Sequence, residues 1–208
     1  MVKKSSVLLM ALMAINAQAA TGNLLSNPGF ESGLDSWQHW GNAAIRVASP
    51  APYEGSKYLF GERTASFSVW QDIDILAAGL AAAEIDAGRY TADFGGFQAG
   101  WNTQTDYGRI SLHFYDDQLA EIGSSSLPGF YSNNTWIEQA GAAAVLAGTR
   151  TIRYQFVGTR VEGLNDDAYL DAAYLTVAAV PEPESYALML AGLAVVGVVA
   201  RKRSARTA

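Results

Sequence analysis

Apolar and polar residues alternate with a period of two through the interior of the chain, and this pattern limits the fold more than any other feature. The alternation is clearest in residues 67–75 and recurs in residues 89–94, 110–115, 151–156 and 171–177. Successive side chains of a β-strand point to opposite faces, so a period of two predicts strands with one buried face. In the last segment, we expect Asp171 to share a face with Ala173 and Leu175.

Turn-forming residues separate these segments: Asn27-Pro28-Gly29, Ala87-Gly88, Asp116-Asp117, Pro128-Gly129 and Ala147-Gly148. Short strands without alternating helices predict an antiparallel sandwich or barrel. Residues 75–85 are the exception, because their small and apolar side chains favour either a short helix or a loop. The expected fold class is therefore all-β.

The composition excludes several kinds of chemistry. The 208 residues include no cysteine and two histidines, His39 and His113. This excludes disulfides, cysteine-ligated metal sites and thiol nucleophiles, and most histidine metal sites. The net charge of −6 argues against nucleic acid as a partner, since proteins that bind nucleic acid need a concentrated basic surface.

Residues 1–20 resemble a secretory signal peptide. Lys3 and Lys4 precede an apolar stretch over residues 7–15, and Ala17-Gln18-Ala19 is a small-residue cleavage pattern. The stretch is shorter than the roughly 20 residues that span a membrane. We expect export by the Sec machinery and cleavage by signal peptidase after Ala19 or Ala20. The alternative is an N-terminal helix in the core.

The C-terminal end has three parts. Pro181-Glu182-Pro183 breaks regular structure, residues 186–200 carry no charge, and a basic cluster follows. The basic cluster consists of Arg201, Lys202, Arg203 and Arg206. Basic residues stay on the cytoplasmic side, so the pattern predicts a hydrophobic helix in the membrane with the preceding domain outside.

These three parts, in this order, resemble the PEP-CTERM protein-sorting signal of Gram-negative bacteria. The resemblance implies that exosortase recognises Pro181, Glu182 and Pro183 and removes the tail. An inner-membrane-anchored precursor would then become a protein of the cell surface or the extracellular polysaccharide matrix. The alternative is an ordinary membrane anchor.

We therefore divide the chain into a signal peptide (1–20), a β-sandwich (21–178) and a sorting signal (179–208). Residues 21–180 retain eight of the 14 basic and 18 of the 20 acidic residues, so their net charge is −10. This exported part is acidic and contains all five tryptophans.

The exported part opens with residues 23–31, which with Gly33 and Trp37 form the pattern N-x-G-F-E-x-G-x-x-x-W. This pattern resembles the opening of carbohydrate-binding modules with a galactose-binding-like jelly roll. Residues 68–73 and 169–175 resemble a core strand and the closing strand. The resemblance covers most of residues 23–178 and implies that residues 21–178 form an antiparallel jelly-roll β-sandwich.

In that fold the first and last strands are neighbours, which would bring Glu31 close to Asp171. Two carboxylates with nearby carbonyl oxygens suit calcium, so a structural calcium ion is a hypothesis. Alternatively, Glu31 caps a loop and Asp171 accepts a backbone N–H. The cluster Asn165-Asp166-Asp167 is interpreted as a solvated turn or, alternatively, as the source of a further calcium ligand.

Sugar binding needs exposed aromatic rings, and the candidates for stacking on sugars are Trp101, Trp40 and Tyr53. Trp37 is interpreted as a core residue, whereas exposure and burial are both open for Trp101. Ser111, His113 and Tyr115 share one face of a strand, which is either a shallow binding surface or a solvated face.

We expect no catalysis. No G-x-S-x-G turn presents a serine, and no phosphate-binding loop is present. The sequence thus predicts an exported, non-catalytic surface or matrix protein that binds glycans. The alternatives are a structural or adhesive matrix protein without a defined ligand and a hydrolase acting on glycans.

Overall fold

The computed structural model describes residues 20–180 and 191–193. Residues 20–180 lie within one compact unit, and residues 191–193 are helical. The predicted signal peptide and sorting signal otherwise lie outside the described residues. Within the described ranges, the structure contains no helix that is long and apolar enough to cross a membrane.

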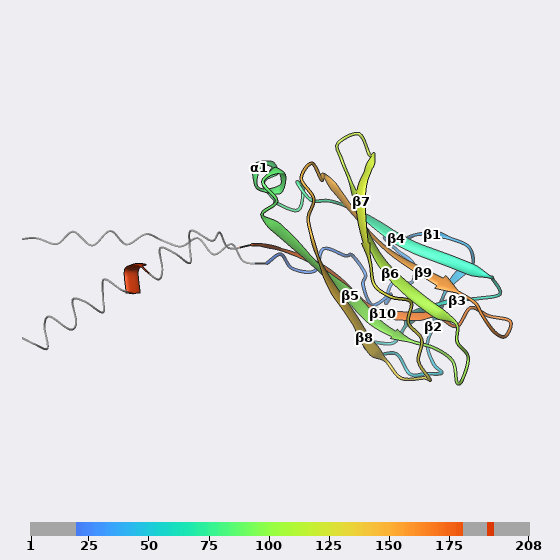
Figure 1. The fold of residues 1–208 in the computed structure, drawn as a ribbon. Helices are drawn as coiled ribbons and strands as arrows, with labels where there is room; N and C mark the ends of the chain where they lie inside the picture. Colours follow the sequence, from blue (N-terminus) through green and yellow to red (C-terminus); the bar gives the residue numbers. More distant parts are fainter. Residues whose placement is uncertain (1–19, 181–190, 194–208) are drawn as a thin grey trace, which may run out of the picture. The chain divides into compact units, whose positions relative to one another are not determined.

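Two antiparallel five-stranded sheets form the unit, which confirms the predicted all-β sandwich (Figure 1). We name each sheet after its central strand. The β9 sheet has the order β1 (Gln38–Trp40), β4 (Ser66–Asp74), β9 (Thr151–Thr159), β6 (Tyr107–Tyr115), β7 (Glu121–Ser126). The β10 sheet has the order β2 (Ala43–Arg46), β3 (Tyr58–Gly61), β10 (Tyr169–Ala179), β5 (Tyr90–Ala99), β8 (Ile137–Ala144). Each sheet has an inner face toward the core and an outer face away from it.

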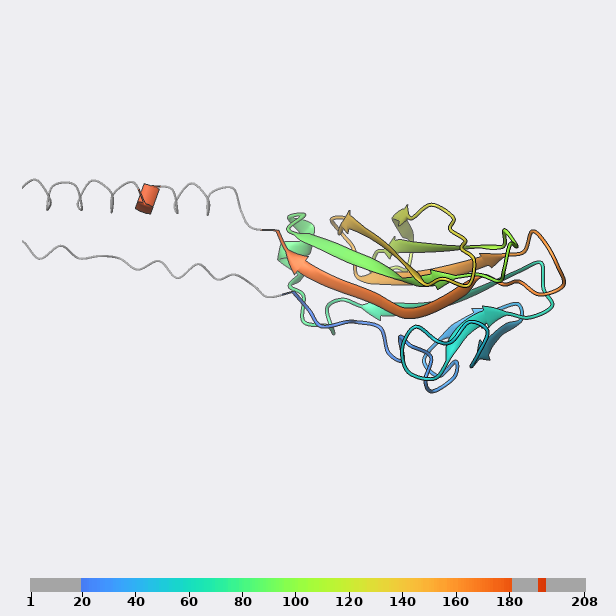
Figure 2. The ribbon, with the colours of Figure 1, turned by 90° about the horizontal axis from the view of Figure 1, so that it is seen from below.

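The chain enters and leaves the sandwich at the same end (Figures 1 and 2). The N–H of Thr21 donates to the carbonyl of Val177 over 2.9 Å, and that of Leu24 donates to Leu175 over 2.8 Å. The first and last residues of the compact unit therefore lie at one end of the sandwich.

The core consists of the inner residues of the alternating segments. In β9, Ile152, Tyr154 and Phe156 are fully buried, while the residues between them are partly exposed. Trp37 is also buried and stacks on Phe30, with ring centroids 5.0 Å apart. The structure thus confirms the predicted strand periodicity and the core position of Trp37.

The alternation predicted for the last strand is wrong at Asp171. A β-bulge interrupts the register of β10 and β5 between Asp171 and Tyr174, and Ala172 has a φ of 45°. Because the bulge adds one residue to β10, the residues before it face the opposite way from what strict alternation with the residues after it predicts. Asp171 consequently lies on the outer face, whereas Ala173 packs in the core.

The segment of small residues before β5 contains the short helix α1 (Ala82–Asp86), which follows a turn. Ile85 of this helix is fully buried and anchors it to the core. The helical alternative for residues 75–85 is therefore correct for their second half.

Gly158 of β9 allows Phe67 to pack directly against the strand. A Cβ at this position would overlap the ring of Phe67, which is fully buried and packs on Phe156. We expect Gly158→Ala to lower the free energy of unfolding by about 1–3 kcal/mol, because overpacking displaces the ring. Urea denaturation measures the change. The control is Gly22→Ala, whose Cβ would meet no atom within 4 Å; equal effects of the two substitutions would contradict the packing argument.

Candidate functional site

Strand pairing brings polar and aromatic residues from distant segments together on the outer face of the β9 sheet. Arg153 of β9 lies opposite Asp72 of β4 on one side and His113 of β6 on the other. Tyr115 of β6 lies opposite Thr151, the residue two positions before Arg153. Paired residues project from the same face, so these side chains form one surface.

Arg153 is the central residue of this surface. Its Nε and Nη2 donate to the two carboxylate oxygens of Asp72 over 2.7 and 2.9 Å. Its Cζ lies 5.3 Å from the ring centroids of both Trp70 and Tyr115. The two-pronged bond to Asp72 and the flanking rings fix the position and the charge of the guanidinium. The hydrogen bond to Asp72 raises the pKa of Arg153, and burial raises the pKa of Tyr115.

A cavity of about 380 Å³ lies beside this ion pair. Its lining residues come from β4, β6, β9 and the β6–β7 turn: Asp72, Asp74, Tyr115, Leu119, Thr151 and Arg153. The lining combines an aromatic ring and an exposed aliphatic side chain with carboxylate, hydroxyl and guanidinium groups. A small organic ligand with hydroxyl groups and an apolar face matches such a lining.

Three hydrogen-bonded side chains continue this surface along β6 and β7. Ser111 Oγ lies 3.2 Å from His113 Nε2, and His113 Nδ1 lies 3.0 Å from Glu121 Oε1. Ser111 is buried, whereas the side chains of His113 and Glu121 are 24% and 44% exposed. The three residues predicted to share a face of β6, Ser111, His113 and Tyr115, do share it.

The predicted sugar-stacking residues do not gather in one place. Trp40 is 64% exposed in β1, and its register opposite Ser68 places it on the same face as Trp70. Tyr53 lies on the other sheet, where its ring stacks on Phe97 at a centroid distance of 3.6 Å.

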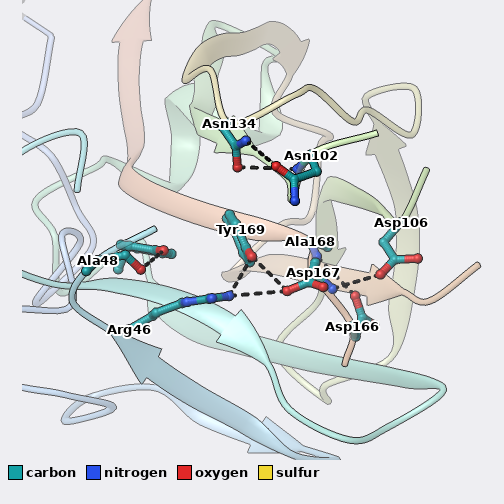
Figure 3. A network of polar contacts seen from close by, with 10 residues as sticks. Arg46, Ala48, Asn102, Asp106, Asn134, Asp166, Asp167, Ala168 and Tyr169 are labelled. Atoms are coloured by element: carbon teal, nitrogen blue, oxygen red, sulfur yellow. Dashed lines mark hydrogen bonds and ion pairs between the residues drawn. The ribbon is translucent and has the colours of Figure 1, made fainter. Parts of the chain in front are cut away.

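Trp101 belongs to an aromatic cluster on the outer face of the β10 sheet. The Cζ of Arg46 lies over the rings of Trp101 and Tyr169, at 5.2 and 5.4 Å from their centroids. Arg46 also donates to the Tyr169 hydroxyl over 2.6 Å and to Asp167 over 3.3 Å (Figure 3). The chain's own guanidinium thus occupies ring surface that a sugar would need, and Trp101 is half-buried.

Glu31 and Asp171 both receive backbone N–H groups from the loop between β2 and β3. Asp171 Oδ2 accepts from Tyr53 and Glu54 over 2.9 and 3.2 Å, and Glu31 Oε1 accepts from Ser56 and Lys57 over 2.8 and 2.9 Å. The bonds from Ser56 and Lys57 lower the pKa of Glu31, while burial raises the pKa of Asp171 to about 6.

These contacts match the alternative in which both carboxylates bind the loop directly. These N–H groups occupy part of the lone pairs that the two carboxylates could offer to a calcium ion. In residues 20–180 and 191–193, no three or more acidic or histidine side chains are placed to hold a metal ion.

Calcium removal and addition distinguish the calcium hypothesis for Glu31 and Asp171 from the alternative in which the two carboxylates only bind the loop. The N–H contacts lead us to expect that adding EDTA leaves the thermal unfolding temperature of residues 20–180 unchanged, and that CaCl₂ does not raise it. Differential scanning calorimetry makes the measurement. A calcium-dependent rise in unfolding temperature that Asp171→Asn abolishes would instead establish the calcium site.

The interpretation of residues 165–167 as a solvated turn is wrong for two of the three residues. Asp166 is fully buried and Asp167 is 5% exposed. Asp166 Oδ1 accepts the N–H of Ala168, but Oδ2 has no hydrogen-bond partner. Burial, with Asp106 and Asp167 nearby, raises the pKa of Asp166 to about 7.

This shift makes stability depend on pH. Between its unfolded pKa, 3.8, and about 7, Asp166 holds a proton in the folded state that it releases on unfolding. The free energy of unfolding therefore falls as pH rises through this window. Asp166→Asn is neutral at every pH and keeps the acceptor for Ala168. We expect it to be more stable than the wild type by up to about 4 kcal/mol at pH 8 and equally stable at pH 4.

Urea denaturation at pH 4, 6 and 8 measures this difference. Asp117→Asn, at an exposed position, is the matched control. A stability difference between wild type and Asp166→Asn that stays constant across the three pH values would contradict the assignment.

Comparisons with known proteins fit this architecture. Residues 179–204 match the PEP-CTERM protein-sorting motif. No curated protein sequence matches the chain significantly.

Several solved structures have a similar fold. TmCBM61, solved with β-1,4-galactotriose, is 21% identical, with a TM-score of 0.50 over 74% of this chain and 98% of its own. A Family 16 Carbohydrate Binding Module-2 is 18% identical, with a TM-score of 0.52 over 74% and 99%. The cyclase Fisc from Fischerella sp. TAU is 10% identical, with a TM-score of 0.56 over 78% and 100%.

The chain therefore carries a PEP-CTERM sorting motif, and its compact unit has the jelly-roll fold found in carbohydrate-binding modules. Carbohydrate-binding modules and a cyclase thus share this fold.

The sequence did not reveal the ion pair between Asp72 and Arg153. Asp72 and Arg153 each alternate with apolar residues in their segments, and this alternation predicts only that both side chains face outward. Nothing in either segment indicates that the two strands are neighbours, because 81 positions separate the residues.

Proposed function

We propose that this protein is an exported carbohydrate-binding protein and that the outer face of the β9 sheet holds the glycan. The observation that carries the proposal is the cavity of about 380 Å³ in which Tyr115 lies beside the ion pair of Arg153 and Asp72. The jelly-roll fold shared with carbohydrate-binding modules supports this assignment.

The lining residues suit a sugar in two ways. The Tyr115 ring offers an apolar surface to the C–H face of a pyranose. Arg153 donates hydrogen bonds and Asp72 accepts them. Together they can bind one sugar hydroxyl that accepts a hydrogen bond and a neighbouring one that donates. Because Asp72 and the two rings already hold Arg153 in place, binding costs little further side-chain entropy.

The sorting motif supports a destination outside the cytoplasm. Exosortase would recognise Pro181, Glu182 and Pro183 and remove the tail from a precursor anchored in the inner membrane. The released unit would reach the cell surface or the exopolysaccharide matrix, where glycans are abundant.

A glycan array probed with residues 20–180 tests the proposal, with β-1,4-galactotriose among the probes. We expect Tyr115→Ala to weaken binding about tenfold, because a lost ring contact is worth roughly 1–1.5 kcal/mol. Arg153→Lys should also weaken binding, since lysine cannot form the two-pronged contact.

Trp101→Ala is the matched aromatic control from the other sheet and should bind as the wild type does. If Trp101→Ala alone lost glycan binding, the binding site would lie on the β10 sheet instead. Absence of any bound glycan would favour a structural or adhesive matrix protein.

A further inference from the structure

Beside the cavity, the hydrogen-bonded chain of Ser111, His113 and Glu121 has the connectivity of a serine nucleophile with its base and orienting carboxylate. The two contacts measure 3.2 Å from Ser111 Oγ to His113 Nε2 and 3.0 Å from His113 Nδ1 to Glu121 Oε1. Both contacts are within or close to the distances that such groups show in a structure without substrate.

The chemistry of the three groups determines which one donates the proton in each hydrogen bond. An ionised Glu121 can accept hydrogen bonds but cannot donate them, so Nδ1 of His113 carries the proton between them. In a neutral ring, Nε2 is then an acceptor, and the hydroxyl of Ser111 must donate to it. His113 is thereby held in the tautomer that can take the serine proton.

Strand geometry, and not a tight turn, produces this arrangement. Ser111 and His113 are two residues apart in β6 and therefore project from the same face. Glu121 comes from β7, which pairs with β6, and lies opposite Tyr115 in the register. A search for a G-x-S-x-G turn could not detect such a site.

The chain of side chains also adjoins the proposed glycan site. His113 lies opposite Arg153, and Tyr115, which lines the cavity, is two residues further along β6. Arg153 binds Asp72 through Nε and Nη2, which leaves Nη1 as a donor for a bound carbonyl oxygen.

We propose that Ser111, His113 and Glu121 cleave ester groups, such as O-acetyl groups, from glycans held on the outer face of the β9 sheet. The choice of an acylated glycan rests on the proposed function, whereas the nucleophile itself does not.

The reaction balances without any further cofactor. Ser111 Oγ bonds to the acyl carbon while its proton moves to His113 Nε2. The ester C–O bond then breaks, and the sugar oxygen leaves with that proton. Water next attacks the acyl-serine, gives a proton to His113 and releases a carboxylic acid, and His113 returns the proton to Ser111.

The experiment uses residues 20–180 with 4-nitrophenyl acetate as substrate and a fluorophosphonate as covalent probe. We expect hydrolysis and a fluorophosphonate adduct that peptide mass spectrometry locates on Ser111. Ser111→Ala and His113→Gln should lower the rate at least about 100-fold. Ser124→Ala, which removes an exposed serine opposite His113 on β7, should leave the rate unchanged.

Glu121→Gln keeps the experiment decisive if a buried substitution disturbs folding, because this side chain is partly exposed. It should lower the rate while the unfolding temperature stays at the wild-type value. The proposal would be overturned if no fluorophosphonate adduct formed on Ser111. It would also be overturned if Ser111→Ala and Glu121→Gln left the rate of hydrolysis unchanged. Glycan binding by Ser111→Ala is measured separately: binding without hydrolysis in the wild type contradicts the esterase alone, and hydrolysis without binding contradicts the proposed function alone.

Discussion

The antiparallel pairing of β9 with β4 and β6 determines what the outer surface of this protein can do. The register places Arg153 between Asp72 and His113, and it places Tyr115 opposite Thr151. A shift of one residue in either pairing would turn one set of these side chains toward the core. The buried inner residues of the same strands, such as Tyr154 and Phe156, prevent that shift because they must stay in the core. The core thus specifies the site, although no core residue belongs to it.

The two outer faces differ in how the chain itself uses them. On the β10 sheet, Arg46 covers Trp101, and the loop between β2 and β3 is bound by Asp171 and by the Trp136 indole, which donates to the carbonyl of Ala51 over 2.7 Å. On the β9 sheet, polar side chains bind one another across strands and leave a cavity beside Tyr115. The first arrangement stabilises the sandwich, while the second leaves surface for a ligand.

The sequence predicts much of the fold because strand periodicity is a local property. The alternation in residues 67–75 and 151–156 predicts β4 and β9, and the burial of Trp37 follows from its place after the first turn. The outer site depends on which strands are neighbours, and that depends on packing of the whole sandwich. The outward turn of Asp171 and the burial of Asp166 also depend on contacts with distant loops, so alternation and polarity gave the wrong environment for both residues.

The sorting motif and the proposed binding site lie in separate parts of the chain. The sorting motif lies in residues 179–204, whereas the cavity is formed by residues between Asp72 and Arg153. The central claim is that the outer face of the β9 sheet binds a carbohydrate. Amide chemical-shift mapping of residues 20–180 during titration with a glycan selected on the array tests it most directly. The account predicts shifts concentrated in β4, β6 and β9 around Asp72, Tyr115 and Arg153. Shifts concentrated instead around Trp101 and Arg46 on the β10 sheet would contradict it.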